Sequence, residues 1–203
     1  MTSLAINAAK GQIKDSVGNM KQNIGGNKID FNEFNYPPLV KVIHYRITDL
    51  DQQPELKKIA KFLFITHIGV FIWTLFNFIS NCIQAGTVDQ SGQGMRIFLS
   101  IIWLIIINPL HLAWAYFGYR GLVDSDSWLS QFGRFKLLGF ILILVYIVAS
   151  ILGGPMFNGW VRLANLFSNE FPGAGVLALI EILFIYAIIV LMVLCMWKVQ
   201  NRP

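Results

Sequence analysis

One carboxyl group lies inside a long apolar stretch of the sequence and is the first candidate for chemistry. Glu181 is the only charged side chain in residues 176–197. It lies about five residues past the start of that stretch, or roughly 8 Å along a helix, and a carboxyl group at such a depth in a membrane is costly unless it is protonated or paired. Glu181 could handle a proton or an ion, or it could anchor helices through hydrogen bonds. The stretch holds no basic partner, which favours the anchor.

Other polar residues of the apolar stretches fall at two depths. Asn77 and Asn81, in residues 62–83, are expected level with Glu181 at 1.5 Å per residue. His67 and His111 are expected at the same depth as each other, near the opposite side of the membrane from Glu181. There they could hydrogen-bond between helices or form a pH-sensitive pair. Two histidines without a third ligand do not make a metal site, so we predict no metal and favour simple packing.

Motifs for catalysis or cofactor binding are absent from the sequence. It contains no P-loop, no Gly-x-Ser-x-Gly nucleophile motif and no metal-ligand spacing. Asp124 and Asp126 lie in a polar turn, where solvated turn residues are expected. We therefore predict a protein that is not an enzyme and that needs no cofactor. Cys195 lies near the expected cytosolic end of the last apolar stretch, where palmitoylation and an unmodified small side chain both remain open.

The elements that must position these residues are long apolar helices. The chain is 55% hydrophobic and only 13% charged, which excludes an ordinary soluble domain. An apolar run of about 20 residues crosses a bilayer as a helix. We predict an all-α integral membrane protein whose transmembrane domain, residues 62–197, has four spans at about 62–83, 97–116, 137–152 and 176–197. A short interfacial helix is expected between the third and fourth spans, with Trp160, Leu163, Ala164 and Phe167 on one face.

The basic residues predict the orientation of these spans. With the N-terminus in the cytosol, 14 of the 16 Lys and Arg side chains fall on the cytosolic side, and only Arg96 and Arg162 fall outside. This excess on one side is the pattern that sets membrane orientation. Both termini are therefore expected to be cytosolic.

The remaining segments are polar. Residues 1–35 are predicted to form a cytosolic tail, either solvated or folded into a basic amphipathic helix at the membrane surface. Residues 36–61 are predicted to form an extended cytosolic arm, because Pro37 and Pro38 favour extended backbone at its start. Residues 198–203 are predicted to form a cytosolic stub.

Several of these segments together resemble the secretory carrier-associated membrane protein family. Asn35-Tyr36-Pro37-Pro38 is similar to that family's Asn-Trp-Pro-Pro segment before the membrane domain. Similar matches in the same order are the basic-then-apolar run 58–64, Trp103 with Pro109, the run 114–120, and Gly153-Gly154-Pro155 followed by Gly159-Trp160. The similarity covers roughly residues 35–200. The family's longer members carry Asn-Pro-Phe repeats in the tail, and none occurs before residue 62, so the chain resembles a short form.

The resemblance implies a carrier protein without catalysis in secretory and endocytic traffic. Its expected locations are secretory and endosomal vesicles, the Golgi and the plasma membrane. The family's loop between the second and third spans is associated with exocytosis and binding of acidic lipids. Together with the basic residues before the first span, the expected lipid- or partner-binding residues are Lys57, Lys58, Lys61, Tyr119, Arg120, Arg134 and Lys136.

The partners expected from this interpretation are membrane lipids, with anionic phospholipids among them, and other trafficking or membrane proteins. No nucleic acid is expected, and a homo-oligomer remains open. Two alternatives also remain open. One is a small channel or proton-coupled transporter built around Glu181. The other is an accessory subunit of a larger membrane complex, docking through the interfacial segment 160–167.

Overall fold

The computed structural model describes residues 29–88, 91–124, 126–154 and 156–202. Residues 1–28 of the predicted tail 1–35, for which a solvated segment and an amphipathic helix are both open, therefore lie outside the described residues. The chain divides into two compact units, 1–44 and 45–203. The elements of the second unit, in order, are the 3-10 helix η1 (Ile47–Leu50) and the α-helices α2 (Pro54–Thr87), α3 (Gln93–Val123), α4 (Trp128–Leu152), α5 (Trp160–Ser168) and α6 (Pro172–Gln200).

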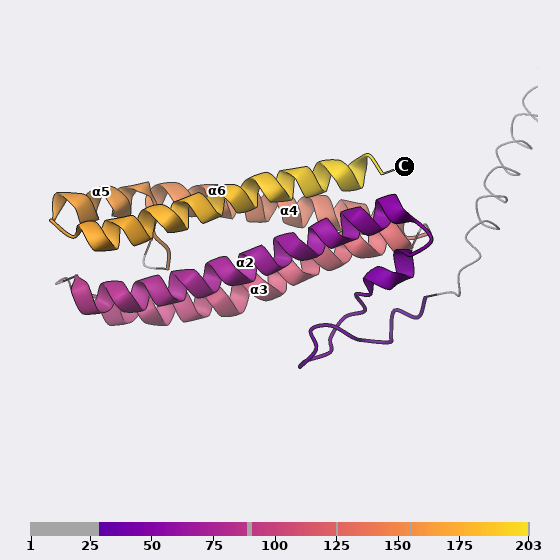
Figure 1. Cartoon of the computed structure of the whole chain (residues 1–203), viewed down its shortest axis with the longest axis horizontal. Helices are drawn as coiled ribbons and strands as arrows, with labels where there is room; N and C mark the ends of the chain where they lie inside the picture. Colours follow the sequence, from indigo (N-terminus) through magenta and orange to yellow (C-terminus); the bar gives the residue numbers. More distant parts are fainter. Residues whose placement is uncertain (1–28, 89–90, 125, 155, 203) are drawn as a thin grey trace, which may run out of the picture. The chain divides into compact units, whose positions relative to one another are not determined.

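The four long helices form a bundle with a closed ring of neighbours. Helix α2 contacts α3, α3 contacts α4, α4 contacts α6, and α6 returns to α2 (Figure 1). The short helix α5 lies against α6 and α4. Each long helix contributes a large, fully buried side chain to the centre: Trp73, Trp114, Tyr146 and Met192. Close packing of aromatic rings, such as Trp73 edge-on to Tyr146 with centroids 5.2 Å apart, fills the interior.

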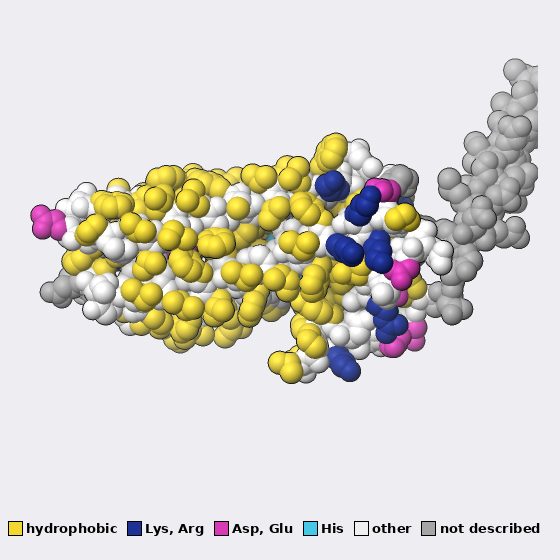
Figure 2. Space-filling model, in the orientation of Figure 1, with side chains coloured by type: hydrophobic (Ala, Val, Ile, Leu, Met, Phe, Trp, Pro, Cys, Tyr) yellow, Lys and Arg dark blue, Asp and Glu magenta, His cyan; other side chains and the backbone are white. Residues whose placement is uncertain are grey.

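The outside of this bundle is apolar along most of its length. Within the described residues, four helices are long and apolar enough to cross a membrane: α2, α3, α4 and α6. Large hydrophobic side chains are exposed on all of them, and Figure 2 shows this apolar surface with Lys and Arg gathered toward the end where α2 begins. Water cannot cover so much apolar surface favourably, but lipid can. The predicted fold class is confirmed by these four helices and by α5 between the third and fourth.

Each predicted span lies inside a longer helix. Helix α2 has 34 residues, or about 51 Å at 1.5 Å per residue, which exceeds the roughly 30 Å of a bilayer core. Helix α4 begins at Trp128, nine residues before the predicted span 137–152. Hydropathy marks only the part of a helix that faces lipid, whereas the helix itself continues into the polar region.

The predicted extended arm 36–61 is partly helical. Helix α2 begins at Pro54, because proline is favoured at the first helical position and Glu55 in the first turn interacts well with the helix dipole. Just before it, η1 contacts α2, and Tyr45 donates a hydrogen bond from its hydroxyl to the Ala60 carbonyl oxygen at 2.8 Å. Residues 45–50 are therefore folded onto the helices.

The described part of the first unit is a loop closed by backbone hydrogen bonds. The Ile43 N–H donates to the Tyr36 carbonyl oxygen at 3.0 Å, and the Tyr36 N–H donates to the Ile43 carbonyl oxygen at 3.1 Å. The Tyr36–Pro37 peptide bond is cis. These bonds hold together the two ends of the segment 36–43.

Helix α5 is fixed by a buried stripe that differs from the predicted face. The sequence placed Trp160, Leu163, Ala164 and Phe167 on one side of the interfacial segment. The structure buries Leu163 and Leu166 against Ala174 and Ala178 of α6, whereas Trp160 and Phe167 remain about half exposed. Gly175 permits this approach, because a Cβ atom there would lie 2.9 Å from the Phe167 ring.

Candidate functional site

Glu181 is the centre of a buried network of polar side chains. The Asn77 amide donates from Nδ2 to Oε1 of Glu181 at 2.7 Å. Asn158, in the turn between α4 and α5, donates its backbone N–H to Oε1 at 3.0 Å and its Nδ2 to Oε2 at 2.7 Å. All three side chains have no exposed surface. The two carboxyl oxygens therefore accept three hydrogen bonds inside the bundle.

Arg96 extends this network to helix α3. Its Nη2 donates to Oδ1 of Asn158 at 2.8 Å and to Oδ1 of Asn81 at 3.1 Å, and its Nη1 donates to the Gly154 carbonyl oxygen at 3.1 Å. The structure thus brings Asn77 and Asn81 to the depth of Glu181. It also adds two residues that the sequence did not assign to the network, Arg96 and Asn158. The cation reaches Glu181 through Asn158, so the carboxyl group has a basic residue in its network.

A tight turn after α4 holds Asn158 in place. Gly153 has a φ of 59°, a conformation that favours glycine. A Cβ atom on Gly159 would lie 2.5 Å from the Gly153 nitrogen and 2.6 Å from the Ala149 carbonyl oxygen, so only glycine fits there. The backbone N–H of Asn158 is consequently presented to α6. We name the set Asn77, Asn81, Arg96, Asn158 and Glu181 the polar anchor, since it ties α2, α3, the α4–α5 turn and α6 together.

His67 and His111 lie side by side between α2 and α3. Their ring centroids are 6.0 Å apart with an interplanar angle of 17°, and the His111 ring lies 4.7 Å from the Trp114 ring. Both side chains are buried. Among the described residues, no group of three or more His, Cys, Asp or Glu side chains could hold a metal ion. The arrangement can therefore contribute aromatic packing between the two helices.

Cys195 is buried between α6 and α2. Its Sγ lies 3.4 Å from Oγ1 of Thr66, and the residue has no exposed surface. A thiol in this position is shielded from an acylating enzyme. Cys82 is exposed, and both cysteines are free.

The lysines before the first span lie on the first turns of α2. Lys57 pairs with Asp51 at 2.5 Å, and Lys58 pairs with Glu55 at 2.6 Å. Lys58 and Lys61 are exposed, whereas Lys57 is half-buried. Exposed ion pairs of this kind contribute little to stability, so these cations remain available to an anionic surface.

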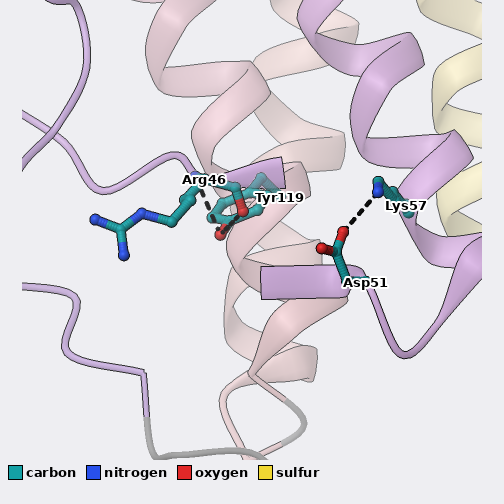
Figure 3. A network of polar contacts seen from close by, with 4 residues as sticks. All are labelled: Arg46, Asp51, Lys57 and Tyr119. Atoms are coloured by element: carbon teal, nitrogen blue, oxygen red, sulfur yellow. Dashed lines mark hydrogen bonds and ion pairs between the residues drawn. The ribbon is translucent and has the colours of Figure 1, made fainter. Parts of the chain in front are cut away.

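Tyr119 does not point toward lipid or a partner as expected. Its hydroxyl oxygen lies 2.9 Å from the Arg46 carbonyl oxygen, and it accepts the Arg46 N–H at 3.3 Å (Figure 3). The same hydroxyl oxygen lies 2.6 Å from Oδ2 of Asp49. Its ring stacks on Tyr45 with centroids 4.4 Å apart, and the residue has no exposed surface. Tyr119 therefore fastens the segment 45–50 to α3.

The other predicted residues of the loop between the second and third spans surround the α3–α4 turn. Arg134 is exposed with its guanidinium 5.9 Å from the Phe117 ring, and Lys136 lies 5.2 Å from the Phe132 ring. Arg120 donates to the Tyr116 hydroxyl at 3.4 Å. These three cations lie at the same end of the bundle as the start of α2. We name this set the basic end: Lys57, Lys58, Lys61, Arg120, Arg134 and Lys136.

Asp124 shapes the turn itself. Its Oδ2 accepts a hydrogen bond from the Ser127 hydroxyl at 2.7 Å, and its Oδ1 accepts one from the Asp126 N–H at 3.1 Å. Burial alone would raise the pKa of Asp124, but the hydrogen bonds from Ser127 and Asp126 and the charge of Arg120 lower that pKa below its ordinary value. Asp124 therefore acts as a local turn residue.

These features define a multi-pass membrane protein with four long apolar helices, a buried polar anchor toward one end and basic side chains at the other, within the described residues. A comparison with known protein families gives a match to the SCAMP family over residues 33–202. The chain belongs to the secretory carrier-associated membrane protein (SCAMP) family, which confirms the resemblance and implies a general role in membrane trafficking. Comparisons with curated proteins and with solved structures gave no match.

Proposed function

We propose that this protein is a non-catalytic carrier component of vesicle membranes in secretory and endocytic traffic, located in vesicles, the Golgi or the plasma membrane. The family match carries the proposal, because residues 33–202 include all the helices of the described chain. The polar anchor supports it, since the Glu181 carboxyl group is engaged in hydrogen bonds from Asn77 and Asn158 inside the bundle. The protein would act through its surfaces, by contacting lipid and by recruiting other membrane proteins.

The surface that best suits this role is the basic end. Each Lys or Arg near an anionic membrane surface contributes about 1 kcal/mol of attraction. Lys58, Lys61 and Arg134 are exposed, so their charges can reach phospholipid head groups directly. We therefore propose anionic phospholipids as partners of the basic end.

Lipid selectivity of the reconstituted full chain tests this partner. Spin-labelled phosphatidylserine should associate with the wild-type protein more strongly than spin-labelled phosphatidylcholine. Replacing Lys57, Lys58 and Lys61 together by Gln should lower the ratio of the two association constants, because the attraction depends on charge and three of the six cations of the basic end are removed. The matched control replaces the same three residues by Arg, which keeps the charge and should keep the ratio. An unchanged ratio in the Gln variant would contradict lipid binding by this surface.

Localisation and traffic in the source cell test the function itself. A tagged full chain should co-localise with secretory or endocytic carriers, and loss of the protein should slow the delivery of a secreted reporter or the uptake of a membrane tracer. Residence in another organelle, with normal rates of both processes, would contradict the carrier function. Mass measurement of the protein after mild solubilisation would test whether it forms a homo-oligomer or a stoichiometric complex with a partner.

A transporter built around Glu181 is the alternative that the same protein preparation can test. The two carboxyl oxygens are occupied by Asn77 and Asn158, which favours an anchor over a transport site. In proteoliposomes, the wild type and Glu181→Gln should show the same background proton and cation flux. A flux that depends on the carboxyl group would replace the carrier proposal by the transporter.

A further inference from the structure

The loop 36–43 carries a cluster of exposed apolar side chains at its tip. Leu39 is 97% exposed, Val40 is 66% exposed and Val42 is 49% exposed. Lys41, between the two valines, is exposed as well. We name these three apolar residues the apolar tip. Exposed apolar clusters are unfavourable in water and mark surfaces that contact a partner or a membrane.

The backbone presents the apolar tip in a closed loop. Hydrogen bonds between Tyr36 and Ile43 join the two ends, and the Val42 N–H donates to the Tyr36 carbonyl oxygen at 3.0 Å. Pro37 and Pro38 restrict the backbone dihedral angles on the way to Leu39. Little conformational entropy therefore remains to be lost when the apolar tip binds, which favours insertion.

The chain also limits how far the apolar tip can move from the bundle. Tyr45 is fixed to the helices through the Ala60 carbonyl oxygen and the Tyr119 ring. Tyr45 lies six positions after Leu39 in the sequence, and six extended residues span at most about 22 Å. Chain connectivity alone therefore keeps Leu39 within about 22 Å of Tyr45, which bonds to Ala60 of α2.

We propose that the apolar tip inserts into the membrane leaflet at the basic end, with Leu39 and Val40 among the acyl chains and Lys41 at the phosphate groups. This proposal rests on the membrane-spanning bundle and not on the trafficking function. Three small side chains bury far less than the roughly 800 Å² per partner of a stable protein interface, so a lipid surface suits them better than a protein. An apolar residue next to a lysine also matches the composition of the interface between acyl chains and anionic head groups.

Depth-dependent fluorescence quenching of the full chain in liposomes tests the insertion. In a Cys82→Ser background, Leu39→Cys is labelled with an environment-sensitive fluorophore, since the remaining Cys195 is buried. The matched control is the same label on Asn32→Cys, an exposed polar position in the same unit. A label on Val40→Cys provides an independent second reading. The liposomes contain phosphatidylcholine with or without phosphatidylserine, and quenchers are either bromine atoms on the acyl chains or iodide in the buffer.

Insertion predicts opposite results at the apolar tip and at the control position. The labels on residues 39 and 40 should be quenched by brominated acyl chains and should be several-fold less sensitive to iodide than the label on residue 32. Phosphatidylserine should strengthen that difference, and Lys41→Gln should abolish this strengthening. Equal iodide quenching at all positions would overturn the proposal. Protection from iodide without quenching by brominated chains would also overturn it, because a protein would then cover the apolar tip.

Discussion

Removal of the Glu181 carboxyl group should destabilise the bundle strongly. Glu181→Ala takes away the acceptor for three donors, the Asn77 amide and the backbone and side-chain N–H groups of Asn158. A buried donor left without a partner costs about 1–3 kcal/mol, and breaking a buried charged network costs about 3–5 kcal/mol in total. We take about 3–5 kcal/mol as the expected loss in the free energy of unfolding.

A thiol-reactive dye can measure this loss in detergent. In a Cys82→Ser background, the buried thiol of Cys195 reacts only when the bundle opens. At roughly 2–4 °C per kcal/mol for a chain of this size, the unfolding midpoint should fall by roughly 6–20 °C. Asn169→Ala is the matched control, because the Asn169 amide is exposed and bonds only within its own turn, and its midpoint should stay close to that of the parent.

Two results would refute the reasoning about the polar anchor. The first is a Glu181→Ala midpoint that stays within the error of the parent protein. The second is additivity in a double-mutant cycle, in which Asn77→Ala costs as much in the Glu181→Ala background as in the parent. Contacting residues in one network should instead show coupling of about 0.5–3 kcal/mol.

Three further substitutions test other contacts. Gly159→Ala should lower the unfolding midpoint, because the added Cβ atom would meet backbone atoms that cannot move aside. Gly133→Ala is the control and should leave the midpoint unchanged, because there is open space around Gly133. Equal midpoints for the two variants would contradict the tight turn. Tyr119→Phe should free the segment 45–50 for proteolysis, since the hydroxyl contacts are lost, and unchanged cleavage would show that ring stacking is sufficient. Arg202→Ala removes a guanidinium 3.7 Å from the Trp128 ring and should cost about 1 kcal/mol, measured by the same dye assay against Arg202→Lys.

The sequence was sufficient to predict the helices that cross the membrane, because hydropathy and length follow directly from the solvent. It could not predict where those helices end. Pro54 begins α2 and Trp128 begins α4 well outside the apolar runs, where helix formation depends on local capping and packing and not on lipid. For this reason the prediction of an extended arm over residues 36–61 is wrong for residues 54–61, which belong to α2.

The polar anchor was predicted in part. Depth counting at 1.5 Å per residue put Asn77 and Asn81 level with Glu181, because a straight helix converts residue number into height. Arg96 and Asn158 were missed. Arg96 lies at the start of α3, and its long side chain reaches Asn81 and Asn158. Asn158 belongs to an irregular turn, where the helical spacing of residues cannot be used to predict depth. Arg96 and Arg162 are the only basic residues predicted to lie outside the cytosolic side. This scarcity was the signal in the sequence that could have drawn attention to Arg96.

Tyr119 shows a different limit. The family resemblance placed it in a loop that contacts lipid, but the structure continues α3 to Val123 and covers Tyr119 with residues 45–50. The contacts of Tyr119 with Arg46 and Asp49 join residues 73 and 70 positions apart in the sequence. Such a long-range contact leaves no mark in the local sequence pattern.

Labelling of single cysteines in sealed vesicles, with their cytosolic face outward, tests the membrane arrangement most directly. In a Cys82→Ser background, Asp126→Cys reports the α3–α4 turn and Glu170→Cys reports the segment between α5 and α6; both positions are exposed. Four crossings with a cytosolic basic end predict that an impermeant thiol reagent modifies residue 126 in sealed vesicles and residue 170 only after detergent is added. The reverse pattern, or modification of both positions before detergent, would contradict the orientation and the lipid contacts proposed for the basic end.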